Sequence, residues 1–144
     1  MYEKTPCYYG VVKSMIALIE YKKRFEASAE IDNKLKQGLE YILKHEIYKK
    51  LSADMPIEPS IIENFYPYTY KKTNIIEILY LLKANKLIDD GRCKEAIEIL
   101  KQKQRKDGFW QADSIYMKTA WIEFDKIKNK GPWISYIIDK LLNG

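Results

Sequence analysis

Aromatic side chains are the residues of this sequence whose type and spacing best suit ligand chemistry. They gather near expected helix starts, at Tyr8, Tyr9, Tyr66, Tyr68, Tyr70, Trp110 and Trp121. Aromatic faces attract cations and pack against apolar chains, so such a group could hold an apolar molecule or stabilise a carbocation. The same rings could instead form the core between helices, with the tyrosine hydroxyls bonded to solvent or backbone. The residues alone leave both interpretations open.

The ionisable side chains with catalytic potential stand apart from one another along the chain. His45, the single histidine, lies at an expected helix end, where it could bond nearby carbonyls. Cys7 and Cys93 fall at expected helix starts and do not combine with His45 into a zinc-binding pattern. We predict that both are free, buried thiols. Arg92 follows two aspartates and is expected to form a local ion pair rather than a phosphate site. No catalytic residue, metal ion or cofactor is predicted.

Capping residues predict the helices that must position these side chains. Helix starts are expected at Thr5, Asp32, Thr73, Asp90, Ser114 and Pro132. The helix after Thr5 is expected to be buried on most sides, and the helix after Thr73 is apolar nearly all round. The helices after Asp32 and Asp90 carry one apolar face. Residues 52–72 contain three prolines and interrupt the pattern, so we expect an ordered, extended insertion there.

The expected helices repeat in pairs. Equivalent starts recur after about forty residues, from Thr73 to Ser114 and from Asp90 to Pro132, which is typical of helical repeats. We expect three helical hairpins, over residues 5–50, 73–105 and 114–142, with apolar helices inside and amphipathic helices outside. The predicted fold is all-α, a single domain over residues 1–144 that forms an open segment of an α/α toroid.

Composition narrows the class of protein. The chain has 144 residues, 47% of them apolar and 13% aromatic, which is enough for a substantial core. Its 25 basic and 20 acidic residues are interspersed along helix faces, so the net charge of +5 indicates solvated surfaces rather than a nucleic-acid site. We recognise neither a signal peptide nor a transmembrane segment, and expect a soluble, cytoplasmic protein.

Several stretches resemble the squalene/hopene cyclase and prenyltransferase superfamily. Gln104, Gly108 and Trp110 match the end of its QW repeat, and the resemblance extends over residues 5–18, 43–50 and 55–90. It implies a truncated bacterial member with fewer hairpins than a closed toroid. It also implies that Trp110 packs over a hairpin junction while Gln104 bonds nearby backbone groups.

The catalytic motifs of that superfamily are missing from this sequence. There is no DxDD motif for protonating a polyene, and no Asp, Cys and His set accompanies Cys7 to bind zinc as in protein prenyltransferases. Related sequences carry Thr-Asp at the start of an inner helix, where this chain has Thr73-Asn74. Asparagine cannot act as a general acid. The thioester loop of complement-like toroids is absent as well.

These points favour a non-catalytic toroid-type module that binds a hydrophobic, isoprenoid-like ligand or a protein partner through its inner-helix face. The ligand-binding residues we predict are Tyr8, Tyr9, Tyr66, Tyr70, Asn74 and Trp121. A homodimer or a missing toroid half could cover the open side. Two alternatives stay open: part of an active terpenoid cyclase or prenyltransferase whose catalytic acid lies outside this chain, or a purely structural fragment.

Overall fold

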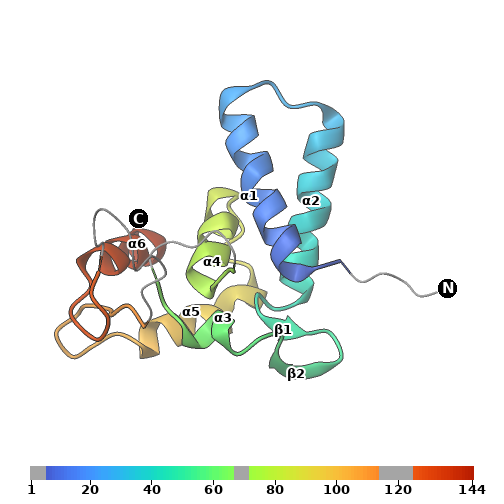
Figure 1. The fold of residues 1–144 in the computed structure, drawn as a ribbon. Helices are drawn as coiled ribbons and strands as arrows, with labels where there is room; N and C mark the ends of the chain where they lie inside the picture. The colour runs from blue at the N-terminus through green and yellow to red at the C-terminus, as the bar shows by residue number, and fades with distance from the viewer. Residues whose placement is uncertain (1–5, 67–71, 114–124) are drawn as a thin grey trace.

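The computed structural model describes residues 6–66, 72–113 and 125–144 and is predominantly helical (Figure 1). The elements in chain order are α1 (Tyr8–Arg24), α2 (Ala29–Lys44), β1 (Lys49–Lys50), β2 (Ala53–Pro56), α3 (Ser60–Glu63), α4 (Ile75–Ala84), the 3-10 turn η1 (Gly91–Cys93), α5 (Lys94–Gln102) and α6 (Pro132–Asn143). The fifth helix expected after Ser114, with Trp121, lies outside the described residues.

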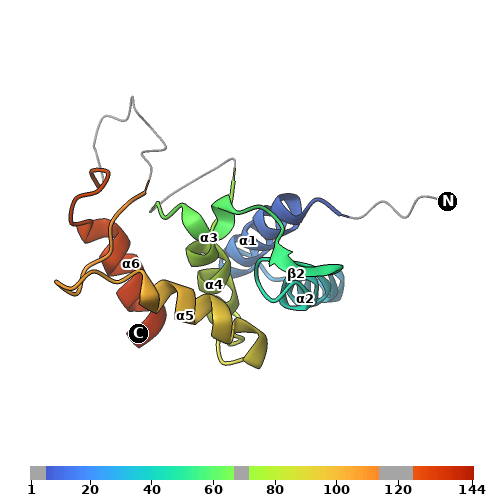
Figure 2. The same cartoon turned by 90° about the horizontal axis from the view of Figure 1, so that it is seen from below.

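Helix α4 is the centre of the core. It contacts α1, α5 and α6, and it lies between the α1–α2 hairpin and α6 in both views (Figures 1 and 2). Six of its ten residues are buried: Ile75, Ile76, Ile78, Leu79, Leu81 and Leu82. Each buried aliphatic side chain contributes roughly 1.5–3 kcal/mol through removal from water. The expectation that this helix is apolar on nearly all sides is confirmed. The expectation that α1 is buried on most sides is wrong, because only Tyr8, Val12 and Met15 of its 17 residues are buried.

Helices α1 and α2 form a hairpin that projects from the rest of the fold (Figure 1). Met15 of α1 packs directly over Gly38 of α2, and a Cβ at Gly38 would lie 2.2 Å from the Met15 sulfur. Glycine at this position therefore permits the close approach of the two helices. At the base of the hairpin, Lys13 joins α1 to α4 through Glu77, with a separation of 2.6 Å.

The starts of α1 and α2 differ from the capping prediction. Cys7 rather than Thr5 precedes α1 and makes no side-chain capping bond, while Thr5 lies outside the described residues. Ser28 caps α2 by accepting from the backbone N–H of Ile31 at 3.4 Å. Asp32, the predicted cap, instead lies in the first turn of α2, where its negative charge suits the helix dipole and pairs with Lys22.

The other described helix starts lie close to their predicted positions. Asn74 rather than Thr73 caps α4, since its side chain accepts from the Glu77 N–H at 3.1 Å. The Asp90 side chain accepts from the Arg92 N–H at 2.9 Å and begins η1, which leads into α5. Pro132 occupies the first turn of α6, as predicted, because its missing N–H costs nothing there.

Helices α2 and α4 end in the same way. After α2, the N–H of Ile47 bonds the Ile42 carbonyl, and Glu46 adopts a left-handed φ of 42°. After α4, the N–H of Leu87 bonds the Leu82 carbonyl, and Lys86 has a φ of 59°. Both are Schellman endings, in which a left-handed residue turns the chain and satisfies the last carbonyls of the helix.

The expected extended insertion contains regular structure, so the all-α prediction is wrong at this point. Strands β1 and β2 form a two-stranded antiparallel sheet, and the short helix α3 follows. The Lys49 ammonium orders this region by lying 2.8 Å from Asp54 and 2.5 Å from Glu95 of α5. Tyr48 reinforces the connection by donating to the same Glu95 carboxylate at 2.5 Å. Ion pairs thus join the insertion to α5, while Ile61 and Phe65 of the same region are buried in the core.

Within the described part of the chain, no helix is both long enough and apolar enough to cross a membrane.

Substitution of Gly38 by alanine tests the close approach of α1 and α2. We expect Gly38→Ala to lower the free energy of unfolding by about 1–3 kcal/mol, because overpacking against Met15 outweighs the better helix propensity of alanine. In urea denaturation, the double variant Gly38→Ala/Met15→Ala should lose less than the sum of the two single changes. Strict additivity would contradict the proposed contact.

Candidate ligand-binding groove

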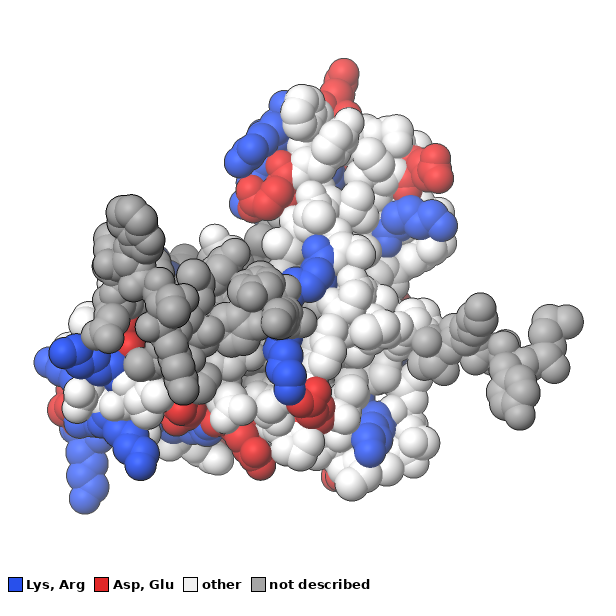
Figure 3. All heavy atoms as spheres, in the orientation of Figure 1, with Lys and Arg blue, Asp and Glu red and all other residues white. Residues whose placement is uncertain are grey.

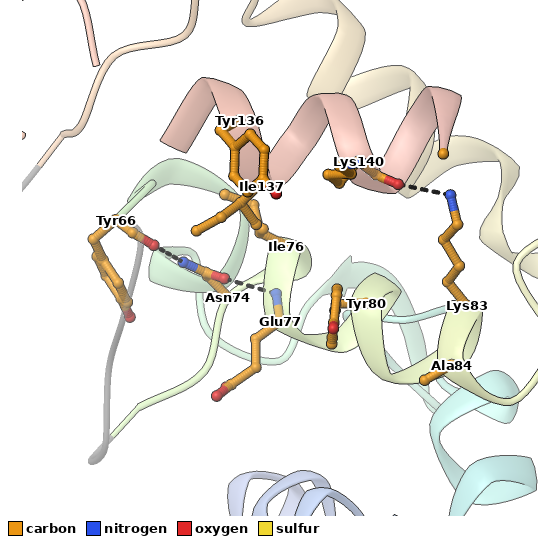
Figure 4. A pocket seen from close by; sticks show the side chains of 11 residues that line it. Tyr66, Asn74, Ile76, Glu77, Tyr80, Lys83, Ala84, Tyr136, Ile137 and Lys140 are labelled. Carbon is orange, nitrogen blue, oxygen red and sulfur yellow. Dashed lines mark hydrogen bonds between the residues drawn. The ribbon is translucent and has the colours of Figure 1, made fainter. Parts of the chain in front are cut away.

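A groove of about 720 Å³ lies between α4 and α6, and we call it the α4–α6 groove. Its apolar and aromatic lining consists of Tyr66, Ile76, Tyr80, Ala84, Tyr136 and Ile137. Its polar lining consists of Asn74, Glu77, Lys83 and Lys140, with Gly144 at the end of α6. This volume falls within the range typical of small-molecule sites, and a mostly apolar wall with a few polar groups is their usual composition (Figure 4).

Asn74 fixes one end of the groove through its backbone partners. Its Nδ2 donates to the Tyr66 carbonyl at 3.2 Å, while its Oδ1 accepts from the Glu77 N–H as the cap of α4 (Figure 4). The side chain is buried and uses both ends of its amide for the fold. Asn74 therefore positions Tyr66 against the start of α4, and a ligand would contact the wall that these bonds hold in place.

Lys83 fixes the other end of the groove. Its ammonium donates to the Lys140 carbonyl oxygen at 2.7 Å (Figure 4) and to the Leu141 carbonyl oxygen at 2.8 Å, both in the last turns of α6. These carbonyls are among the groups that a helix end leaves unpaired, and a cation there also suits the helix dipole. The bonds hold the ends of α4 and α6 together and so set the width of the groove.

Two tyrosines present their rings to solvent along the groove. Tyr80 is 55% exposed although it lies on the otherwise buried helix α4, and Tyr136 of α6 is 58% exposed. Tyrosine offers a large apolar contact area at a low cost in conformational entropy, because only two side-chain torsions are fixed. The two rings are the part of the wall that a ligand could cover with the greatest gain in buried surface.

Charge at the groove is unequally compensated. Glu77 accepts from Lys13 at 2.6 Å and from the Thr73 hydroxyl at 2.6 Å, so its negative charge is neutralised locally. Lys140 lies over the Tyr136 ring with its nitrogen 5.9 Å from the centroid. On the α1–α2 hairpin, by comparison, acidic and basic side chains lie beside one another (Figure 3). The groove thus has two lysines, Lys83 and Lys140, at the end where α6 finishes.

The predicted aromatic site is divided by the structure. Tyr66 and Asn74 line the α4–α6 groove, whereas Tyr70 and Trp121 lie outside the described residues. Tyr8 is buried and donates its hydroxyl to the Ile47 carbonyl. Burial raises the pKa of Tyr8 well above the usual value, and its ring packs against His45 and Tyr41. Tyr8 therefore contributes to the hairpin base and does not line the groove.

Tyr9 belongs to a hydrogen-bonded cluster around Glu58. The Tyr9 hydroxyl donates to Glu58, which also accepts from Lys72 at 2.6 Å and from Ser60 at 2.8 Å. Partial burial, followed by the bond to Glu58, raises the pKa of Tyr9. Lys72, then Tyr9 and Ser60, lower the pKa of Glu58 from 4.5 to about 2. This cluster joins α1 to the insertion.

Gln104, Gly108 and Trp110 form a compact turn after α5. The Gln104 side-chain amide donates to the Gly108 carbonyl at 2.8 Å, and Gly108 has the left-handed φ of 80° that glycine tolerates. Trp110 is 5% exposed and donates its indole N–H to the Leu100 carbonyl at 2.7 Å. That carbonyl lies in the last turn of α5, where a helix needs external donors. Within the described residues, these contacts serve packing and helix termination.

The isolated ionisable residues have structural partners. His45 is buried with its Nδ1 2.6 Å from the Lys49 carbonyl, and its Nε2 has no hydrogen-bond partner among the described residues. Cys93 is buried as predicted, and burial raises the pKa of its thiol to about 11. Cys7 is exposed, so the prediction of a buried thiol is wrong there. The expected local ion pair of Arg92 is present, at 2.8 Å from Asp90, with a second pair to Glu40.

The described residues contain no group of three or more His, Cys, Asp or Glu side chains placed to hold a metal ion.

Of the residues that line the groove, the sequence predicted only Tyr66 and Asn74 as site residues and missed, among others, Tyr80, Lys83, Tyr136 and Lys140. It concentrated on helix starts, whereas these residues lie in the middle and at the ends of α4 and α6. A usable signal was present, since Ile76, Tyr80 and Ala84 recur at intervals of four along one helix face. A tyrosine in an otherwise aliphatic helix marks the side that remains open.

Comparison with protein-family models, with curated proteins and with solved structures finds no match for this chain. The resemblance to the cyclase and prenyltransferase superfamily accordingly stays a prediction.

Replacement of Trp110 tests its role as a helix-terminating donor. We expect Trp110→Phe to lower the free energy of unfolding by about 1–3 kcal/mol, because the buried Leu100 carbonyl loses its partner. Trp133, which is 48% exposed, provides the control, and Trp133→Phe should change stability by less than about 0.5 kcal/mol. Equal losses in urea denaturation would contradict the assignment.

The Glu58 cluster should make stability depend on acid pH. Because the folded-state pKa of Glu58 is lowered, its contribution is complete above pH 4.5 and is lost as the pH falls towards about 2. We expect Glu58→Gln to cost about 0.5–1 kcal/mol at pH 7, after allowance for solvent screening, and much less at pH 2. Chemical denaturation at both pH values measures this, with Glu26→Gln in the exposed α1–α2 loop as control. An equal loss of unfolding free energy at both pH values would contradict this role of Glu58.

Proposed function

We propose that this chain is a non-catalytic binding module, built from hairpins of the toroid type, that holds an apolar, isoprenoid-like molecule in the α4–α6 groove. The observation that carries this proposal is the pair of exposed tyrosine rings over an apolar groove floor, Tyr80 and Tyr136. Exposed aromatic surface that borders a groove of ligand size is typical of binding sites for apolar molecules.

The helix arrangement supports the toroid part of the proposal. Helices α1 and α2 pack as one hairpin, α4 packs on α5, and the first helices of the two pairs, α1 and α4, contact each other. In stacked helical repeats, neighbouring units bury one another's faces in this way. The groove lies on the side of α4 that α1 and α5 leave open, where Tyr80 is exposed.

The chemistry of the groove supports binding without catalysis. General acid catalysis needs a side chain that can deliver a proton to the bound molecule. Among the described lining residues, Glu77 has the one carboxyl group, and Lys13 and Thr73 both bond to it. Asn74, at the position where the superfamily that the sequence resembles carries an acid, uses its amide to cap α4. The one carboxylate side chain of the described lining and Asn74 are thus both engaged in contacts within the fold.

Affinity for an isoprenoid alcohol tests the proposal directly. We expect farnesol to bind the purified chain, and Tyr80→Ala and Tyr136→Ala each to weaken binding roughly three- to tenfold through lost contact area. Titration calorimetry measures the affinity, and circular dichroism should show unchanged helix content because both side chains are more than half exposed.

Tyr21→Ala provides the matched control, because Tyr21 is a 42% exposed tyrosine of α1 that does not line the groove. Farnesol affinity that is unaffected by both groove substitutions, or reduced equally by Tyr21→Ala, would reject this site.

A further inference from the structure

The charged groups of the α4–α6 groove decide what kind of head group its ligand can carry. Two lysines, Lys83 and Lys140, lie at the end of the groove where α6 finishes. Glu77 supplies the one carboxylate side chain of the described lining, and it pairs with Lys13 at 2.6 Å. A ligand therefore meets two ammonium groups at one end of the groove and a mostly apolar wall along the rest.

The two lysines are not equivalent. Lys83 donates to two carbonyl oxygens of α6 and is committed to holding the helix ends together. Lys140 is exposed and lies above Tyr136, with 5.9 Å between its nitrogen and the ring centroid. The structure places no carboxylate in an ion pair with Lys140 among the described residues. The groove thus offers one available ammonium next to an exposed aromatic ring.

We propose, on the basis of the binding function proposed above, that the α4–α6 groove binds a long-chain carboxylate. The carboxylate bonds to the Lys140 ammonium, and the chain lies along Tyr136, Ile137, Ile76 and Tyr80 towards Asn74. A cation is disfavoured at the lysine end, which argues against the carbocation chemistry that aromatic residues could otherwise support. The groove is suited to the anionic form of the ligand.

The number of available donors favours a carboxylate over a phosphate or diphosphate. Phosphate groups carry up to two charges each and are normally bound by several cationic or backbone donors, often with a bidentate arginine. The described lining contains no arginine, and its second lysine already serves the α6 carbonyls. The one available ammonium, that of Lys140, therefore matches the single negative charge of a carboxylate.

Four probes with the same twelve-carbon chain separate these possibilities: dodecanoate, dodecanol, dodecyltrimethylammonium and dodecyl phosphate. Each is titrated calorimetrically into the full chain below its micelle concentration. We expect dodecanoate to bind roughly three- to tenfold more tightly than dodecanol, and dodecyltrimethylammonium to bind more weakly than both. The preference for dodecanoate over dodecanol should decrease as salt is added, because Lys140 is exposed.

Lys140→Gln should remove the preference for dodecanoate over dodecanol, because it weakens dodecanoate binding more than it weakens dodecanol binding. Lys101→Gln, at an exposed lysine of α5, is the matched control and should retain the preference. Both substitutions are at exposed positions, so each variant is expected to fold.

The outcomes of these titrations can be separated from the outcome of the farnesol titration, which tests the proposed binding function. Farnesol and dodecanol binding without a preference for dodecanoate would overturn the carboxylate assignment alone. Tighter binding of dodecyl phosphate would replace the carboxylate by a phosphate ligand, and tighter binding of dodecyltrimethylammonium would reverse the inferred charge. Absence of binding by every apolar probe, farnesol included, would overturn the carboxylate assignment and the proposed function together.

Discussion

The burial of α4 is the constraint on which the rest of the described structure depends. A ten-residue helix with six buried aliphatic side chains is stable only if other elements cover several of its faces, and α1, α5 and α6 do so. Its polar ends must then be satisfied locally. Asn74 caps the first turn, and Lys86 and Leu87 close the last turn through a left-handed residue. The surrounding helices are thus arranged around α4 and shield its six aliphatic side chains from water.

The candidate site follows from the same constraint. Three neighbours cannot cover a helix completely, and the face that includes Ile76, Tyr80 and Ala84 borders the groove. Tyrosine suits this boundary because its ring can pack on the apolar helix while its hydroxyl remains in water. The polar bonds of Asn74 and Lys83 set the walls, so the groove is pre-organised and a ligand need not order them. The proposed ligand binding and the proposed charge preference therefore depend on residues that also serve helix packing.

Local sequence signals predicted much of the helical framework because caps and apolar periodicity act over a few residues. Pro132 and Asp90 mark helix starts within one or two positions, and the apolar character of α4 is evident from its composition. The β-hairpin was not predicted because one of the contacts that anchor it, the ion pair between Lys49 and Glu95, joins residues distant in sequence. The predicted aromatic site was divided for a similar reason: the partner of Tyr8 is the Ile47 carbonyl, which no local pattern reveals. Groove residues on α4 and α6 become neighbours only through tertiary packing.

The projecting α1–α2 hairpin implies an uneven distribution of local stability. Near its base, Lys13 bonds to α4 and Tyr8 packs beneath α2, so opening there must also disturb the core. Near its tip, the exposed pair Tyr21 and Phe25 stack on each other, with ring centroids 4.9 Å apart. At the tip, the helical hydrogen bonds of the hairpin are therefore the main protection of the backbone amides from hydrogen exchange. At the base, contacts with the core around α4 add to that protection. We expect the hairpin to open from its free end before its base, because the base shares contacts with α4.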